Sequence, residues 1–210
     1  MLPTTRAAAV RVVEAACEFA RARGTSRFSV CHRAALLPHT DGLFLHTARN
    51  VVVRYPEVGF EARDVDEVAR ELVRAPQDFA VLAAQPGAGS LLAAVAAGLV
   101  GGPDFAPCFH LGPAGPQATP QATTGLAVFG ATWPTVPPAA GAGLGALPGP
   151  WAVILASVWA LRHLGETAPA GRLEAAAAAV LADRGAGGDG AAWTAAAVGE
   201  ALTDALTHAS

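Results

Sequence analysis

Cysteine and histidine are the residues of this chain that could bind a transition metal or supply a nucleophile. The three cysteines, Cys17, Cys31 and Cys108, have no Cys-x-x-Cys spacing, and their odd number argues against a disulfide framework. The six histidines have no i,i+4 metal spacing, and Cys108-Phe109-His110 is by itself a weak metal signal. The sequence therefore predicts neither a zinc site nor a nucleophile–base pair, and it favours a reducing, cytoplasmic compartment.

The segment 85–102, QPGAGSLLAAVAAGLVGG, is rich in glycine and alanine and contains no charged residue. A phosphate-binding loop is one interpretation, but PGAGS lacks the Lys-Ser/Thr ending and the glycine spacing of a P-loop. The remaining interpretation is an alanine-rich buried helix.

The charge balance and composition exclude two classes of partner. A formal net charge of −3 and an isoelectric point near 6.0 provide no basic field for nucleic acid or an anionic membrane surface. The mean hydropathy is high, at +0.38, and no charged residue lies between Asp104 and Arg162. Prolines interrupt that interval repeatedly, so no apolar run reaches the roughly 20 residues of a spanning helix. We therefore expect neither nucleic-acid binding nor membrane insertion.

The elements that must position any site follow from hydrophobic periodicity and punctuation by glycine and proline. In the first half, helices and strands alternate: helices over 5–23, 40–55, 65–76 and 89–98, and strands over 27–32, 58–64 and 79–84. The helix over 65–76 is expected to carry one apolar stripe, formed by Val65, Val68, Ala69, Leu72 and Val73. In the second half, a Gly/Pro/Thr-rich stretch with one short strand precedes three helices: strand 125–130 and helices 150–164, 171–183 and 192–207. Asp41, Asp64 and Glu67 have the spacing of helix caps, and Gly24 that of a helix C-terminus. This order predicts a layered α/β fold.

Five stretches resemble, in order and spacing, the C-terminal part of the decarboxylating β-hydroxyacid dehydrogenases, the family of isocitrate and 3-isopropylmalate dehydrogenases. They are CHRAALLPHTDGLF (31–44), VDEVARELVRAPQDF (65–79), LVGG (99–102), LAVFGATWPTVPPAAG (126–141) and LRHLGETAPAGRLEAA (161–176). The resemblance implies an α/β, truncated isopropylmalate-dehydrogenase-like layered fold without the N-terminal portion. Residues 1–102 would form a small, dimerisation-domain-like part, and 103–210 a loop-rich and then helical remnant of the large domain.

The resemblance also implies a chemistry that this chain lacks. Enzymes of the family oxidise a 2-hydroxy acid with a nicotinamide cofactor and use a divalent ion, held by carboxylates, to decarboxylate it. Ser90 and Ala94 occupy the positions of two metal-ligating aspartates, and Arg33 occupies that of the proton-transfer lysine. A guanidinium remains charged at any physiological pH and cannot exchange that proton. Adenine recognition is likewise lost from WPTVP (133–137) and from Leu147.

The resemblance places Asp66 at the position of the family's third metal-ligating aspartate, which, like the lysine position Arg33, would act across a dimer interface. We therefore expect a non-catalytic pseudoenzyme with no cofactor and no metal, in which Arg33 and Asp66 contact a partner site or a ligand. The expected partner is a full-length dehydrogenase homologue, a second copy of the chain, or both.

Three other interpretations stay open. Asp66 could serve the helix dipole alone, and Arg33 could be a solvated residue at a strand end. The chain could be a homo-oligomeric sensor of a carboxylate or nucleotide, without turnover. A residual enzyme with new chemistry is the third alternative, although the sequence contains no general base or metal constellation.

Overall fold

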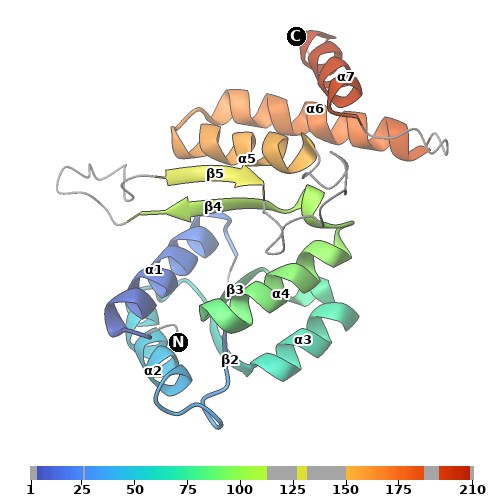
Figure 1. Ribbon diagram of the computed structural model, residues 1–210. Coiled ribbons are helices and arrows are strands. Elements are labelled where there is room, and N and C mark those ends of the chain that lie inside the picture. Colours follow the sequence, from blue (N-terminus) through green and yellow to red (C-terminus); the bar gives the residue numbers. More distant parts are fainter. Residues whose placement is uncertain (1–3, 26, 113–126, 132–149, 187–193, 209–210) are drawn as a thin grey trace, which may run out of the picture. The chain divides into compact units, whose positions relative to one another are not determined.

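The computed structural model describes residues 4–25, 27–112, 127–131, 150–186 and 194–208, and the chain folds into two compact units, Met1–Leu99 and Val100–Ser210. Unit 1 alternates helices and strands in the predicted order (Figure 1). Its elements are α1 (Arg6–Ala22), β1 (Phe28–His32), α2 (Asp41–Val52), β2 (Phe60–Asp64), α3 (Val65–Arg74), the 3₁₀ turn η1 (Pro76–Asp78), β3 (Val81–Ala84) and α4 (Pro86–Leu99). The layered α/β prediction is confirmed. Gly24 also has the positive φ, 63°, expected just after the end of a helix.

The sheet of unit 1 is parallel, with the strand order β2-β1-β3. The central strand β1 is buried along most of its length, as parallel strands covered on both faces are. The register pairs His32 with Asp64 and Cys31 with Ala84, so the carboxyl ends of all three strands lie along one edge. That edge is where open α/β sheets place their ligand-contacting residues.

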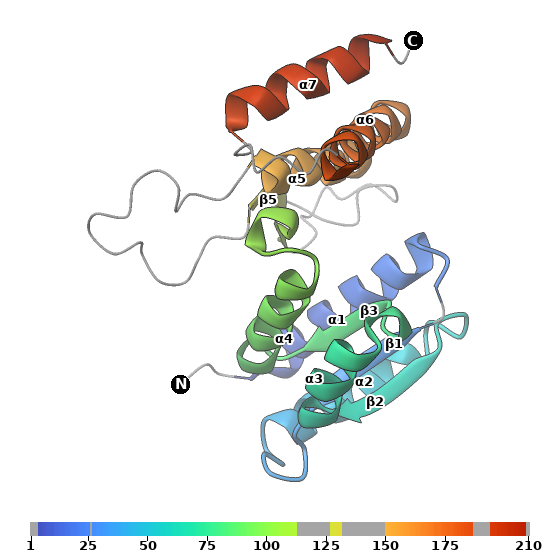
Figure 2. The same cartoon turned by 90° about the vertical axis from the view of Figure 1, so that its right-hand side faces the viewer.

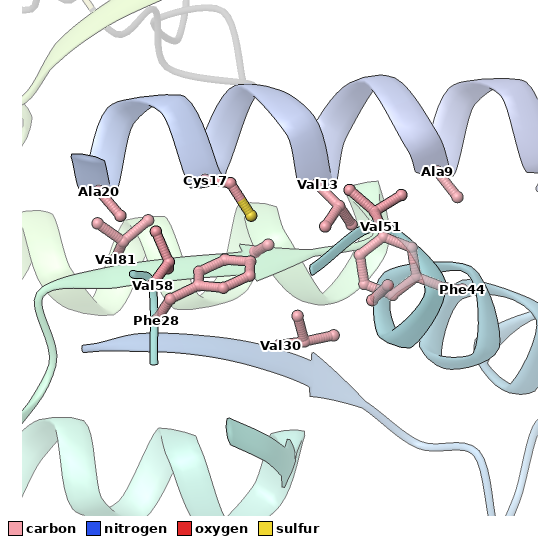
Figure 3. Close-up of a cluster of buried hydrophobic side chains, with 12 residues drawn as sticks. Ala9, Val13, Cys17, Ala20, Phe28, Val30, Phe44, Val51, Val58 and Val81 are labelled. Atoms are coloured by element: carbon pink, nitrogen blue, oxygen red, sulfur yellow. The ribbon is translucent and has the colours of Figure 1, made fainter. Parts of the chain in front are cut away.

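Alternate strand residues enter two separate cores, one on each face of the sheet. Phe28 and Val30 of β1 pack with α1 and α2 in the first core (Figure 3). Cys31 faces the other way and packs with Val68 and Leu72 of α3 and with α4. Figure 1 shows α1 and α2 on one side of the strands and α3 and α4 on the other. Because alternate residues of a strand point to opposite faces, helices can pack on both sides of the sheet. Unit 1 therefore has three layers: helices, sheet and helices.

Unit 2 consists of a strand pair and three helices. The elements are the 3₁₀ turn η2 (Pro103–Phe105), β4 (Pro107–Leu111), β5 (Ala127–Ala131), α5 (Pro150–His163), α6 (Thr167–Ala186) and α7 (Ala195–His208). Trp151 of α5 is 2% exposed and stacks on Phe105, and its core includes Val180 of α6 and Val198 of α7. Figure 2 shows α5, α6 and α7 of this unit. Among the described helices, none has the length and apolar character needed to traverse a lipid bilayer.

Three details differ from the sequence predictions. Strand β4 was not predicted, because its five residues begin with proline and carry a weak alternation; proline is tolerated as the first residue of a strand. Helix α4 begins at Pro86 rather than residue 89 and buries only Leu92 and Ala97, so the prediction of a buried helix is wrong. Val73 was expected on the buried stripe of α3 but is 58% exposed, since the stripe follows residues 65, 68 and 72.

Candidate functional site

Arg33 and Asp66 meet at the carboxyl edge of the parallel sheet. Arg33 directly follows β1, and Asp66 lies in the first turn of α3. The guanidinium of Arg33 forms an ion pair with the Asp66 carboxylate, and the two side chains are 42% and 65% exposed. The resemblance assigned Arg33 and Asp66 to a site separately. The fold brings their side chains together in one exposed ion pair.

The backbone at the start of α3 fixes the position of Asp66. Asp64 ends β2 opposite His32 of β1 and is the N-cap of α3, as predicted. Its carboxylate accepts a hydrogen bond from the Asp66 N–H at 2.9 Å. Asp66 thus lies at the positive end of the helix dipole, which favours its carboxylate. Because β1 and β2 are in register, this end of α3 lies next to Arg33.

Asp41 links the ends of β1 and β3 and, contrary to the prediction, does not cap α2. Its carboxylate accepts the Arg33 N–H at 2.7 Å and the side-chain amide of Gln85 at 2.6 Å. Gln85, directly after β3, in turn accepts the Thr4 hydroxyl at 2.5 Å. Thr40, the N-cap residue of α2, makes no capping bond with its side chain. The buried Asp41 carboxylate therefore fixes the backbone of Arg33, a role that its cap-like position in the sequence concealed.

Helix α4 carries no ligand for a hard cation at the two positions that the resemblance assigns to metal-binding aspartates. Ser90 donates its hydroxyl to the Gly87 carbonyl at 3.1 Å, and Ala94 has no polar side-chain atom. No group of three or more His, Cys, Asp or Glu side chains is placed to hold a metal in the described segments. Mg²⁺ and Mn²⁺ require several oxygen ligands with negative charge. The side chains at these two positions of α4 therefore do not fit the ion of the family.

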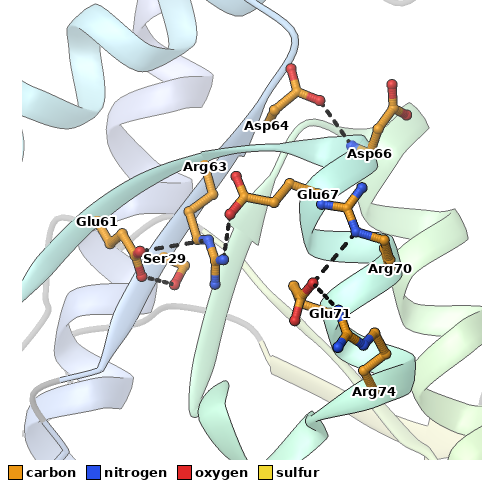
Figure 4. A network of polar contacts seen from close by, with 9 residues as sticks. All are labelled: Ser29, Glu61, Arg63, Asp64, Asp66, Glu67, Arg70, Glu71 and Arg74. Atoms are coloured by element: carbon orange, nitrogen blue, oxygen red, sulfur yellow. Dashed lines mark hydrogen bonds and ion pairs between the residues drawn. The ribbon is translucent and has the colours of Figure 1, made fainter.

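A charged network covers the outer side of β2 and α3 next to the ion pair (Figure 4). Arg63 donates to Glu67 at 2.5 Å and lies 3.5 Å from Glu61, and its guanidinium is 5.3 Å from the ring centre of Phe79. The hydrogen bond with Glu67 raises the pKa of Arg63, and the same bond lowers the pKa of the Glu67 carboxyl. Glu67, predicted as a capping-box partner, therefore pairs with Arg63, and this network links strand to helix.

Three other titratable groups remain protonated at neutral pH. Burial raises the pKa of the Cys31 thiol to about 12, an effect that the Arg63 charge opposes. Burial and the charge of Glu18 raise the pKa of Cys17 to about 11. The pKa of Tyr55 rises to about 12 through burial and a hydrogen bond to Glu18. None of these groups is poised as a general base or a nucleophile.

A hollow of about 420 Å³ opens in unit 1 at the other end of the strands. It is lined by Arg27, Phe28, Ser29, Gly59, Phe60, Glu61, Arg63 and Asp78. Phe28 and Phe60 are the first residues of β1 and β2, whereas Arg33 and Asp66 lie beyond the last. This hollow is therefore separate from the candidate site. The predicted loss of adenine recognition at 133–137 and Leu147 concerns positions outside the described residues.

Comparisons with known proteins match the chain over nearly its whole length. The family model described as isocitrate/isopropylmalate dehydrogenase matches residues 2–206. The chloroplastic 3-isopropylmalate dehydrogenase of Solanum tuberosum is 35% identical over 160 residues, which cover 76% of this chain and 41% of that protein. A mitochondrial regulatory subunit of isocitrate dehydrogenase [NAD] from Dictyostelium discoideum is 31% identical over 161 residues, or 77% and 42% of the two chains.

A solved structure agrees with this result. The isocitrate dehydrogenase of Methylococcus capsulatus superposes with a TM-score of 0.81 at 29% identity, covering 98% of this chain and 58% of that one. The matched residues cover 41% and 42% of the two curated relatives above, so the chain spans less than half of their length.

Proposed function

The chain belongs to the isocitrate/isopropylmalate dehydrogenase family, and on this premise we propose that it is a non-catalytic subunit that binds a full-length dehydrogenase of the family and modulates it. One observation carries the proposal. The metal-helix positions are Ser90 and Ala94, while Arg33 and Asp66 remain at positions where the resemblance implies contact across a subunit interface.

The side chains at these positions argue against turnover by the chain itself. A serine hydroxyl bonded to its own helix and an alanine methyl cannot replace two carboxylates on a divalent ion. Arg33 occupies the lysine position, and its guanidinium cannot release a proton near neutral pH. The one retained acid, Asp66, is already paired with that guanidinium. At these positions, both binding of the divalent ion and proton transfer thus lack a competent set of groups.

The exposed ion pair is suited to association. An exposed ion pair contributes only about 0–1 kcal/mol to stability. Arg33 and Asp66 can therefore separate and pair with charges on a partner at a small cost in free energy. Asp41 holds the Arg33 backbone, which limits the ordering needed on binding. One relative, the Dictyostelium protein, is named a regulatory subunit, which makes such a role familiar among relatives of this chain.

The test is co-expression of the full chain with isocitrate, isopropylmalate and homoisocitrate dehydrogenases from the same cell. We expect co-elution with one of them in size-exclusion chromatography, together with a changed KM or kcat of that enzyme. Co-elution with none, or NAD(P)-linked oxidation by the isolated chain, would contradict the proposal.

Charge reversal at the edge of the sheet tests where the partner binds. Arg33→Glu and Asp66→Arg should each reduce co-elution and the kinetic effect by at least about tenfold, since reversed charges at an interface repel. Arg74→Glu is the matched control, because Arg74 is 70% exposed at the other end of α3 and also pairs with an acidic residue, Glu71. Equal effects of all three variants would remove Arg33 and Asp66 from the interface.

A small-molecule sensor is the second candidate, favoured by the position of Arg33 at the carboxyl edge of a parallel sheet. A carboxylate ligand would compete with Asp66 for the guanidinium. Thermal-shift screening of the isolated chain with di- and tricarboxylic acids and nucleotides tests this role, because a ligand of the native state raises Tm by mass action. A shift that Arg33→Ala abolishes would favour the sensor over the regulatory role.

A further inference from the structure

Cys108 and His110 lie on the same face of β4, away from its packed side. Alternate residues of a strand point to opposite faces. Phe109 contacts Trp159 of α5 with ring centres 5.8 Å apart, and its cross-strand partner Phe129 contacts His163 at 5.5 Å. The side of the strand pair that carries Phe109 therefore packs on α5, and Cys108 and His110 point to the other side.

The separation of the two side chains matches that of two ligands on one tetrahedral ion. The Sγ atom of Cys108 is 3.7 Å from Nε2 of His110. With metal–sulfur and metal–nitrogen bonds of about 2.3 and 2.0–2.1 Å, a tetrahedral angle places the two ligand atoms about 3.6 Å apart. The distance between the two atoms is therefore compatible with one ion bound to both.

The approach to the two atoms is open. His110 is exposed and Cys108 is half-buried. The residue paired with Cys108 across the strands is Gly130, where even an added methyl group would meet nothing within 4 Å. Cys17 and Cys31 are buried, so Cys108 is the accessible thiol of the chain.

We propose that Cys108 Sγ and His110 Nε2 form a bidentate site for a borderline-soft divalent ion, Zn²⁺, on the face of β4 that points away from α5. Sulfur and imidazole ligands favour Zn²⁺ over Mg²⁺ or Mn²⁺, so the site differs in position and chemistry from the oxygen-ligated ion of the family. On binding, the thiol releases its proton to solvent and the imidazole binds as the neutral ring. No third His, Cys, Asp or Glu of the described segments completes the set, so two coordination positions stay open to water or an exchangeable ligand.

Cobalt titration of the reduced, metal-free full chain tests the proposal. Co²⁺ bound to a thiolate gives a near-ultraviolet charge-transfer absorption, which Zn²⁺ should remove by displacement. We expect this absorption to saturate at one ion per chain. Cys108→Ser should abolish it, and His110→Gln should weaken Co²⁺ binding at least about tenfold, the loss that even outer-shell changes cause in metal sites.

Cys31→Ala and His39→Ala are the matched controls, one at a buried thiol and one at an exposed imidazole. Both should leave the absorption and the affinity unchanged. Far-UV circular dichroism checks that each variant is folded. No absorption in the unmodified chain, or an undiminished signal in Cys108→Ser or an unchanged affinity in His110→Gln, would overturn the proposal.

Discussion

The chemistry open to this chain is set by individual side chains at the carboxyl edge of its parallel sheet and on the helix that follows. Ser90 and Ala94 lie four residues apart on exposed positions of α4, where two carboxylates would share one face. Arg33 supplies a fixed positive charge at the same edge, and Asp66 neutralises it. If the resemblance assigns these positions correctly, Ser90 and Ala94 each lack a negative charge and Arg33 lacks proton exchange, while the backbone could still hold the original groups.

Restoring the two carboxylates should restore part of the ion site. The double substitution Ser90→Asp and Ala94→Asp places two carboxylates one helical turn apart, and Mn²⁺ affinity should rise by about tenfold or more over the unmodified chain. Electron paramagnetic resonance of free Mn²⁺ measures this directly. Ser90→Asn with Ala94→Asn is the uncharged control and should gain little. Equal affinity of both double variants would mean that carboxylate charge is not the missing feature.

Cys31 should make the protein less stable in alkali. Burial raises the pKa of its thiol from 9.0 to about 12 in the native state, so between pH 9 and about 12 the unfolded chain has lost a proton that the folded chain keeps. Stability is therefore fully present below pH 9 and falls above it, by about 1.4 kcal/mol per pH unit. Urea unfolding at pH 8 and 10 should show a smaller loss in Cys31→Ala than in Cys108→Ala. Equal losses would contradict this assignment.

At the scale of elements, α3 shows how one helix serves both the core and the site. Val68 and Leu72 lie on its buried side in the second core, while Glu67 and Glu71 lie on the charged outer side. Asp64 begins the helix and so places Asp66 beside Arg33. Packing of the buried side therefore holds the ion pair at the edge of the sheet.

Neighbouring truncations on α3 should have very different effects. Leu72 is 5% exposed and Val73 is 58% exposed. Leu72→Ala removes buried methyl groups and leaves a cavity, so it should lower the free energy of unfolding by about 2–5 kcal/mol. Val73→Ala should stay within about 0.5 kcal/mol. Chemical denaturation compares the two, and similar losses would show that the helix packs through a different face.

At the scale of the whole molecule, the two units have separate cores. The first core of unit 1 contains Phe28 and Phe44, and the core of unit 2 centres on Trp151. All four tryptophans of the chain lie after residue 100. Tryptophan fluorescence therefore reports on unit 2 alone, while circular dichroism reports on both.

This distribution permits a test of independent folding. Phe44 is 2% exposed, and Phe44→Ala should destabilise unit 1 by about 3–5 kcal/mol. The circular-dichroism transition should then split or move to lower denaturant, with the fluorescence transition unchanged. Val53→Ala, at a residue that is 77% exposed on the chain just after α2, should alter neither signal. A parallel shift of fluorescence in Phe44→Ala would mean that the units unfold together.

The sequence by itself determined the order of elements in unit 1, the three C-terminal helices and the family. These depend on local periodicity, on caps such as Asp64, and on motifs that do not require knowledge of distant contacts. The short strand β4 and the exposure of α4 could not be predicted this way. Five residues beginning with proline give too little pattern, and an apolar helix gives no sign of how much of it is covered.

Only the tertiary structure decided which side chains meet. Arg33 and Asp66 are 33 residues apart, and their ion pair depends on the register of β1 with β2. The pairing of β1 with β3 places Gln85 within reach of Asp41, so Asp41 supports the site instead of capping α2. Cys108 and His110 are close in sequence, but strand geometry rather than spacing sets their 3.7 Å separation. Sequence patterns encode local conformation. The distances between the side chains that form a site depend on strand geometry and on the packing of distant elements.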